Sequence, residues 1–176
     1  MNSNFVPLSA KELIAKINKI PRVNLALLPT VLEFAPNISK ELNINLYIKR
    51  DDCTALAFGG NKTRHLEFIM AKTISGDYDC ILTGASSQSN FCRQAAAAAN
   101  KLNLDSYLVL MHGVKGKLMQ GNFLLYNILG ANVDVVEGED LEKIPIHLDK
   151  KYNQLIKEGR KPLLIYGGFG KEDTAL

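Results

Sequence analysis

The sequence predicts an open α/β fold, a parallel sheet flanked by helices, for most of the chain. From position 79 onward, short apolar runs alternate with longer segments of helical periodicity. Successive runs start about 25 to 30 residues apart, a spacing that suits strand–helix–strand crossovers in a parallel sheet. The expected strands are Cys80–Thr83, Tyr107–Met111, Val133–Val136 and Leu163–Tyr166.

Helices are expected between these strands and just before the first one. The apolar stripe over Arg64–Ser75 predicts a helix that Gly76 ends, and Gly159 suits the end of the last helix. The helices between the strands are expected at Ser89–Leu102, Leu118–Leu129 and Leu141–Lys157.

The residues before position 63 have a looser pattern, punctuated by prolines. Only a short helix at Ser9–Ile17 and a strand at Asn45–Lys49 are expected there. This stretch does not form a domain by itself, so we expect a strip that packs on another part of the protein.

The composition is that of an ordinary globular protein, because 47% of the 176 residues are hydrophobic and 22% are charged. The net charge of +3 is spread along the chain, which argues against a nucleic-acid surface. Three cysteines without a C-x-x-C pair favour a reducing compartment, and neither a signal peptide nor a membrane-length apolar run is found. We therefore expect a soluble, cytoplasmic protein. The three histidines share no ligand spacing with the cysteines, so no metal site is predicted.

The first candidate site is the segment 58–64, Phe-Gly-Gly-Asn-Lys-Thr-Arg, directly before a predicted helix. Its two glycines let the backbone turn and let a flat ligand approach closely. Lys62 would lie at the helix N-terminus, where the dipole and neighbouring positive charge favour the neutral amine that reacts with an aldehyde cofactor. Asn61 can hydrogen-bond a ring substituent. Alone, the segment also fits a solvated lysine after a glycine turn; a Walker loop is excluded, because Asn61 precedes Lys62 where a glycine is required.

The second candidate site is the segment 83–90, at the carboxyl end of a predicted strand and the start of a helix. Ligands of open α/β sheets bind at that edge, and free N–H groups and hydroxyls there suit a substrate carboxylate. The alternative is that Ser87 or Ser89 only caps the helix; both can hold, because a cap and an anion site use the same first turn. Cys92, one turn later, is expected to be a buried small apolar residue.

Two weaker candidates carry no chemistry of their own. The pair Asp51-Asp52 is expected to be structural or solvated. The glycine-rich segment 167–170 fails as a phosphate loop, because Glu172 stands where Ser or Thr is needed.

Taken together, the motifs of this chain resemble those of the D-cysteine desulfhydrase and 1-aminocyclopropane-1-carboxylate deaminase family. The resemblance covers almost the whole chain in the right order, and its most specific block is Gly59–Arg64. The other matching motifs are Leu28–Thr30, Lys49–Asp52, Leu66-Glu67, Gly84–Gln94, Gln120–Asn122 and Leu129–Ala131.

The resemblance implies a fold-type-II pyridoxal-phosphate enzyme of two α/β domains that acts on a small amino acid, usually as a homodimer. Lys62 would hold pyridoxal 5'-phosphate as a Schiff base and shuttle protons, while Asn61 contacts the ring oxygen. Ser89 would be catalytic, as hydroxyl donor or nucleophile. Ser89, Asn90 and Gln88 would bind the substrate.

One departure from the family pattern bears on the substrate. Phe91 stands where cyclopropane deaminases carry a glutamine that helps to bind the carboxylate. This favours the desulfhydrase-like branch, whose β-elimination yields pyruvate, ammonia and sulfide, over the deaminase. Val31 also replaces a proline, with no functional meaning that we can assign. D-cysteine, sulfonate analogues, cyclopropane amino acids and other small D-amino acids all remain open as substrates.

The length is the larger departure, because family members are about twice as long, as two domains require. The resemblance implies a strip of the large domain at 1–61, the small domain at 62–165 and a truncated return to the large domain at 166–176. The missing half would carry the loop for the cofactor phosphate. We therefore expect an N-terminal half that is inactive alone, completed as a full-length homodimer or by a complementary C-terminal chain. The alternative is a truncated, catalytically inactive fragment that folds poorly or serves only as a binding module.

Overall fold

The structure is a computed structural model that describes residues 7–112, 118–138 and 140–166. Within these residues lies a four-stranded parallel sheet with the order β5-β4-β3-β6. Strands β3 and β4 pair along their whole length, from Cys80↔Asp105 to Ser86↔Met111. The predicted open parallel sheet is confirmed. Its strands are β3 (Cys80–Ser86), β4 (Asp105–Met111), β5 (Asn132–Val136) and β6 (Pro162–Ile165).

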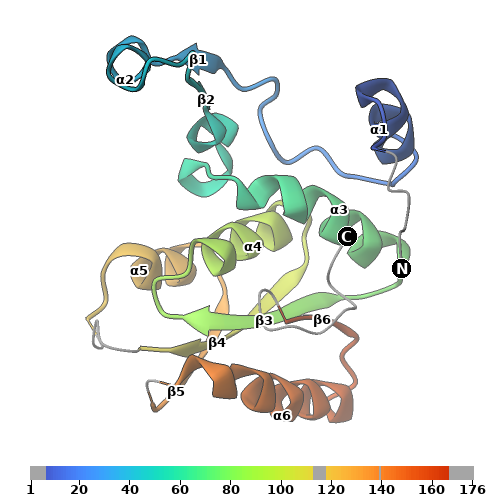
Figure 1. Cartoon of the computed structure of the whole chain (residues 1–176). Coiled ribbons are helices and arrows are strands. Elements are labelled where there is room, and N and C mark those ends of the chain that lie inside the picture. The colour runs from blue at the N-terminus through green and yellow to red at the C-terminus, as the bar shows by residue number, and fades with distance from the viewer. Residues whose placement is uncertain (1–6, 113–117, 139, 167–176) are drawn as a thin grey trace, which may run out of the picture.

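Helices cover both faces of this sheet (Figure 1). The predicted helices before and between the strands are all present, with shifted ends. On one face lie α3 (Lys62–Ser75), α4 (Asn90–Lys101) and α5 (Gly121–Ile128). On the other face lies α6 (Ile144–Lys157), preceded by a 3₁₀ turn at Leu141–Lys143.

Two of the predicted helix starts are wrong for identifiable reasons. The helix expected from Leu118 begins only at Gly121, because Gln120 is extended and the apolar Leu118 and Met119 are exposed. The helix expected from Leu141 is a 3₁₀ turn in its first part. Pro145 has no N–H to donate to the carbonyl four residues earlier, so an α-helix can begin only next to it.

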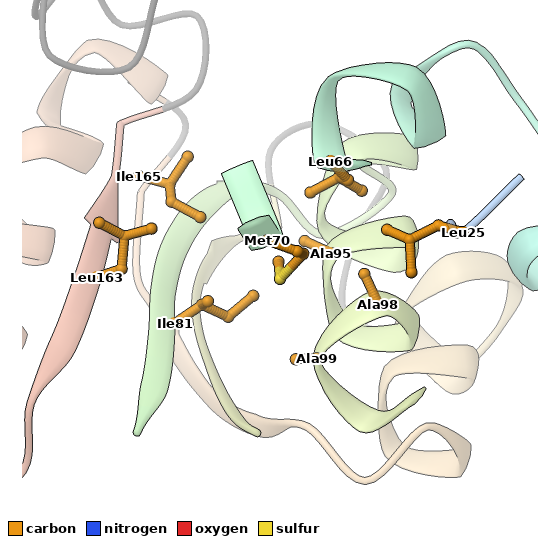
Figure 2. Packing of buried hydrophobic residues seen from close by; sticks show 9 residues of the cluster. All are labelled: Leu25, Leu66, Met70, Ile81, Ala95, Ala98, Ala99, Leu163 and Ile165. Carbon is orange, nitrogen blue, oxygen red and sulfur yellow. The ribbon is translucent and has the colours of Figure 1, made fainter. Parts of the chain in front are cut away.

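The core on the α3 and α4 side is built on close helix packing (Figure 2). Ile81 of β3 points into this cluster, whereas its neighbour Leu82 packs against α6 on the opposite face, as the two-residue period of a strand requires. The run Ala95–Ala99 in α4 is buried throughout, so its small side chains let α4 approach both the sheet and α3. Each fully buried leucine or isoleucine here contributes about 1.5–3 kcal/mol.

The residues before α3 form a strip on the outer side of α3 and α4, and its middle part projects away from these helices (Figure 1). Its helix α1 (Ala10–Ile17) confirms the predicted one and is capped by Ser9, which exchanges hydrogen bonds with Glu12. The expected strand is shorter, β2 (Tyr47–Lys49), and pairs antiparallel with β1 (Leu32–Phe34), which was not predicted. The remaining elements are α2 (Pro36–Leu42) and 3₁₀ turns at Asp51–Thr54 and Leu56–Phe58.

The strip exposes much apolar surface. Of the twenty-four exposed large apolar side chains among the described residues, sixteen lie between Leu8 and Phe58. Helix α1 buries none of its residues, and all six residues of β1 and β2 are exposed. No helix in the described part of the chain combines the length and the apolar character needed to cross a membrane. The predicted glycine-rich segment 167–170 and the return at 166–176, apart from Tyr166, lie outside the described residues.

Candidate active site

The segment that leads to Lys62 has an unusual backbone. Ala57, Phe58, Gly59 and Gly60 follow one another with φ values of 45°, 70°, 73° and 129°. Positive φ is uncommon for residues with a side chain, and strained backbone of this kind persists where surrounding contacts hold it. Such a run directly before Lys62 marks the segment as a candidate functional loop.

Close contacts explain why glycines occupy positions 59 and 60. A Cβ on Gly59 would lie 1.8 Å from the carbonyl oxygen of Asp52, and a Cβ on Gly60 would lie 2.5 Å from Nε2 of Gln94. The Gly60 N–H donates to the carbonyl of Asp51 and to Oγ1 of Thr54. The loop is therefore pressed against its own backbone on one side and against α4 on the other.

Lys62 is the first residue of α3, two residues before the predicted helix start. Its side chain is half-buried, and its Nζ forms no hydrogen bond or ion pair with any other described residue. Lys49, in contrast, donates to the Thr30 carbonyl, and Lys151 pairs with Asp134. The Lys62 amine is thus not engaged by the described part of the chain. The neighbouring Asn61 has an exposed amide that makes no capping bond to α3.

Ser89 begins α4 at the carboxyl edge of the sheet. It is the N-cap residue, and its Oγ accepts a hydrogen bond from the Cys92 N–H at 3.2 Å. The predicted capping role of Ser89 is confirmed, whereas Ser87 instead donates its backbone N–H to the Met111 carbonyl. The carbonyl of Ser89 accepts a bond from the Tyr126 hydroxyl at 2.9 Å, which ties the start of α4 to α5.

Two amide side chains fasten the start of α4 to the start of α5. Oε1 of Gln88 accepts a hydrogen bond from the Asn122 N–H at 2.9 Å, and Nε2 of Gln88 donates to the Gln120 carbonyl at 3.1 Å. Nδ2 of Asn122 donates to the Gln88 carbonyl at 2.8 Å and to Oδ1 of Asn90 at 2.9 Å. Gln88 therefore holds two helices together, and its predicted contact with substrate stays a prediction.

Two side chains of α4 join its start to the lysine segment. Nη2 of Arg93 donates to the Gly59 carbonyl at 3.0 Å. The next residue, Gln94, accepts a bond from the Thr63 hydroxyl at 2.7 Å. Gly59 and Thr63 stand on either side of Lys62 in the sequence. The segment 58–64 therefore contacts the first two turns of α4, and Arg93 also bonds Asn90, the last residue of the segment 83–90.

A buried polar cluster supports this junction. Thr54, Thr63 and Gln94 are each at most 1% exposed, and the two threonine hydroxyls are 3.3 Å apart. The Thr54 hydroxyl also bonds both the N–H and the carbonyl of Gly60. Buried hydroxyls that satisfy one another in this way fix a single loop conformation.

Asp51 and Asp52 are structural, as predicted. Asp51 accepts two bonds from the Arg64 guanidinium, at 2.7 and 2.8 Å, which hold the pKa of the Asp51 carboxyl below its ordinary value. Asp52 pairs with Arg50 at the surface, and the hydrogen bonds of that pair lower the pKa of Asp52 too. Cys92 is fully buried, as predicted, and burial raises the pKa of its thiol to about 12. No cluster of three or more metal-ligating side chains is found in the described ranges.

Sequence reasoning did not assign roles to Arg93, Gln94, Thr54 or Thr63. Arg93 carries a detectable signal, because it lies three residues after Asn90 and so on the same face of α4. Its partner Gly59, thirty-four residues away, is brought near only by tertiary packing. Thr63 lies in the motif Gly59–Arg64, which does not state its partner, and Thr54 gives no signal in the sequence.

Comparisons with known proteins identify the family. A family model described as pyridoxal-phosphate dependent enzyme matches residues 23–172. The chain belongs to this family of pyridoxal-phosphate-dependent enzymes. The match includes both candidate segments and confirms the predicted family.

Among curated relatives in this family, the D-cysteine desulfhydrase of Klebsiella pneumoniae (strain 342) is 35% identical over 174 residues. The match covers 93% of this chain and 52% of that protein. A protein of Pyrococcus horikoshii, named provisionally as a 1-aminocyclopropane-1-carboxylate deaminase, is 37% identical over 158 residues, covering 89% and 47%. The chain therefore spans about half the length of the curated relatives it matches.

Solved structures agree on the fold of the pyridoxal-phosphate enzymes. The crystal structure of an ACC deaminase homologue matches with a TM-score of 0.82 and 37% identity, over 92% of this chain and 49% of that one. The processed form of threonine deaminase isoform 2 from Solanum lycopersicum matches with a TM-score of 0.64 at 23% identity, which shows the fold alone. The predicted fold class is confirmed.

The described residues suit pyridoxal phosphate at its aldehyde end. An aldehyde needs a primary amine that is not held by a carboxylate, and Lys62 meets this condition within the described chain. The loop before it contains two glycines, whose missing Cβ atoms would lie against the backbone of Asp52 and the side chain of Gln94. Asn61, the residue before Lys62 in the sequence, is exposed.

Proposed function

We propose that this chain supplies the lysine-bearing half of the active site of a pyridoxal-phosphate-dependent lyase or deaminase that acts on a small amino acid. The observation that carries the proposal is the junction described above. The unengaged amine of Lys62 is flanked by Gly59 and Thr63, which are bonded to Arg93 and Gln94 near the start of α4. An amine nucleophile and a helix N-terminus able to receive an anion are the two features that an amino-acid substrate of such an enzyme requires.

In this proposal Lys62 holds the cofactor and moves the proton at the substrate α-carbon, while Asn61 donates to the cofactor's ring oxygen. The Ser89 oxygen accepts the capping bond from the Cys92 N–H, and its hydroxyl also interacts with the Cys92 thiol; in this proposal the hydroxyl donates to the substrate instead. Asn90 and the free N–H groups of the first turn of α4 hold the carboxylate. Gln88 is assigned to the same substrate site in addition to its bonds with α5.

Pyridoxal phosphate, when bound, supplies an electron sink for the bond broken at the substrate α-carbon. The primary amine of Lys62 would hold the cofactor through its aldehyde group. For D-cysteine, one amino acid and one water molecule give pyruvate, ammonia and hydrogen sulfide. The chain's own residues orient the substrate and carry the proton.

Deamination of 1-aminocyclopropane-1-carboxylate is the second candidate reaction. Phe91 argues against it, because its ring packs against the apolar cluster between α3, α4 and the sheet. A side chain turned into that cluster adds no polar group to a substrate site. This observation favours the desulfhydrase-like branch.

We also propose that residues 1–61 belong to a large domain and that 62–165 form the small domain. The apolar surface of the strip supports this assignment, and so does the β1–β2 pair, since an isolated two-stranded sheet is only marginally stable. The apolar surface of the strip would be covered by a polypeptide equivalent to the C-terminal half of the relatives. That polypeptide would belong to a full-length homodimer or be a separate chain. Without that half the chain is catalytically inactive. The cysteines form no disulfide, which supports a cytoplasmic location.

Trapping of the cofactor tests the proposal. The chain is incubated with pyridoxal phosphate, reduced with borohydride, and the modified lysines are mapped by mass spectrometry. We expect preferential modification of Lys62, lost in Lys62→Ala and kept in Lys72→Ala, a control from the exposed last turn of the same helix. Modification spread evenly over the exposed lysines would refute the proposal.

The role of the missing half is tested in the same preparation. Production of 2-oxo acid from D-cysteine is expected only after the C-terminal half of the Klebsiella pneumoniae desulfhydrase is added. Turnover by the chain alone would show that the half is not needed. 1-Aminocyclopropane-1-carboxylate is the comparison substrate, and faster turnover of it than of D-cysteine would favour the deaminase.

A further inference from the structure

We propose that Arg93 is a positioning residue that fixes the side-chain amide of Asn90 relative to the loop that precedes Lys62. The inference rests on the proposed function and adds a residue to it. Arg93 is assigned no contact with the reacting atoms; it acts through Asn90 and through Gly59.

The guanidinium of Arg93 spans the junction between the two segments. Nη2 donates to the Gly59 carbonyl at 3.0 Å, and Nη1 donates to Oδ1 of Asn90 at 3.0 Å and to Oδ1 of Asn122 at 2.9 Å. A planar group with several fixed N–H directions holds these three acceptors at set positions. A lysine has one nitrogen and lacks this geometry.

The bonds to Asn90 determine which end of its amide is free. Oδ1 of Asn90 accepts from Arg93 and also from Nδ2 of Asn122. Two donors on the oxygen require that the NH₂ group point away from them, and a reversed amide would set NH₂ against both donors. Asn90 is exposed, and its NH₂ group donates to no described residue. The network therefore presents a free amide donor, the group that a carboxylate binds.

The charge of Arg93 strengthens that donor. Arg93 forms no ion pair with a carboxylate of the described residues, and its three acceptors are all neutral oxygens. Its Nε is buried and has no described acceptor. A cation that bonds an amide oxygen polarises the amide and makes its N–H a better donor. An arginine without a counter-ion contributes little to the stability of the fold, whereas its charge attracts an anionic ligand.

The first test reads the amide directly in the unliganded chain. Arg93→Lys keeps the charge without the fork, and Arg93→Met removes both. Arg160→Lys is the matched control, because Arg160 makes a similar fork to Asp79, Asp105 and Tyr107 at the opposite edge of the sheet. The side-chain amide signals of Asn90 in a ¹⁵N spectrum should shift and broaden in both Arg93 variants and stay unchanged in Arg160→Lys. Unchanged Asn90 signals in both Arg93 variants would overturn the inference.

The second test measures carboxylate recognition at the cofactor lysine. D-alanine and ethylamine both compete for the cofactor aldehyde and so protect Lys62 from borohydride trapping, but only D-alanine has a carboxylate. The half-protecting concentration of D-alanine should be lower than that of ethylamine in the wild type. This advantage should fall about tenfold in both Arg93 variants, while ethylamine protects as before; Arg160→Lys should behave as the wild type.

The outcomes separate the inference from the proposed function. An equal change for both amines would mean that Arg93 only supports the fold, and an unchanged advantage in Arg93→Lys would mean that charge alone suffices; either result overturns the inference. If Lys62 of the wild type is not trapped at all, the proposed function fails, and the Asn90 signals alone then decide the role of Arg93.

Discussion

The substitution Gly59→Ala should destabilise the chain far more than a glycine change without a steric conflict. Gly59 has a φ of 73°, and a Cβ there would lie 1.8 Å from the backbone oxygen of Asp52. Gly159, after α6, has a φ of 80°, and a Cβ there would meet nothing within 4 Å. Both positions have a positive φ, but the ψ of −178° at Gly59 lies in a region that is almost restricted to glycine, so Gly59 carries a backbone penalty of its own besides the clash.

The magnitudes follow from this comparison. Left-handed backbone costs an alanine about 1–2 kcal/mol, offset by about 0.4–1 kcal/mol because alanine restricts the unfolded chain. Gly159→Ala should therefore lose about 1 kcal/mol. The clash at Gly59 is with backbone, which must shift, and overpacking of this kind adds about 1–3 kcal/mol. Gly59→Ala should therefore lose about 2–4 kcal/mol.

Urea unfolding of both variants and of the wild type gives these differences directly. A Gly59→Ala protein as stable as Gly159→Ala would refute the reasoning, because the loop would then not be locked against Asp52. Borohydride trapping of the cofactor at Lys62 is a second measurement on the same variants. A displaced Gly59 carbonyl also loses its bond from Arg93, so the preference for Lys62 over other lysines should fall in Gly59→Ala and persist in Gly159→Ala.

Two further predictions concern ionisable groups. Asp51→Asn should cost about 1 kcal/mol at neutral pH, a value discounted for solvent because Arg64 is 35% exposed. Because the pKa of Asp51 is lowered by folding, its contribution is present above about pH 4 and is lost as the pH falls through its folded-state pKa. The urea midpoints of the two proteins should therefore converge in acid, and a constant difference would contradict the assignment. Ellman's reagent should label exposed Cys53 in the native chain and reach buried Cys92 only after unfolding; early labelling of Cys92 would contradict its burial.

The sheet could be predicted from the sequence because its strands carry continuous apolar runs at regular spacing. Strand β3 lies at the centre, buried on both faces, so its apolar run needed no alternation to be recognised. The β1–β2 pair could not be predicted in full. Each strand is three residues long, too short for a period to be visible, and all of their residues are exposed.

The candidate site, like the fold, could be predicted from the sequence only in part. Lys62 and Ser89 could be chosen because local sequence carries their signal, a glycine turn before one helix and a cap at another. The bond from Arg93 to Gly59 and the bonds from Gln88 to α5 depend on which elements pack together. A sequence motif lists these residues without stating whether they hold a ligand or one another.

Helix α3 links the strip to the lysine. Lys62 begins this helix, and Arg64 in its first turn binds Asp51 of the strip. Buried Glu67, one turn further, accepts the backbone N–H groups of Leu25 and Ala26 at 3.0 and 3.1 Å. The strip is therefore fastened to the same rigid element that carries the amine. A partner that orders the strip would therefore order the start of α3 as well. The attachment of the strip and the Lys62 amine lie on one rigid helix, so fixing the position of one fixes the other.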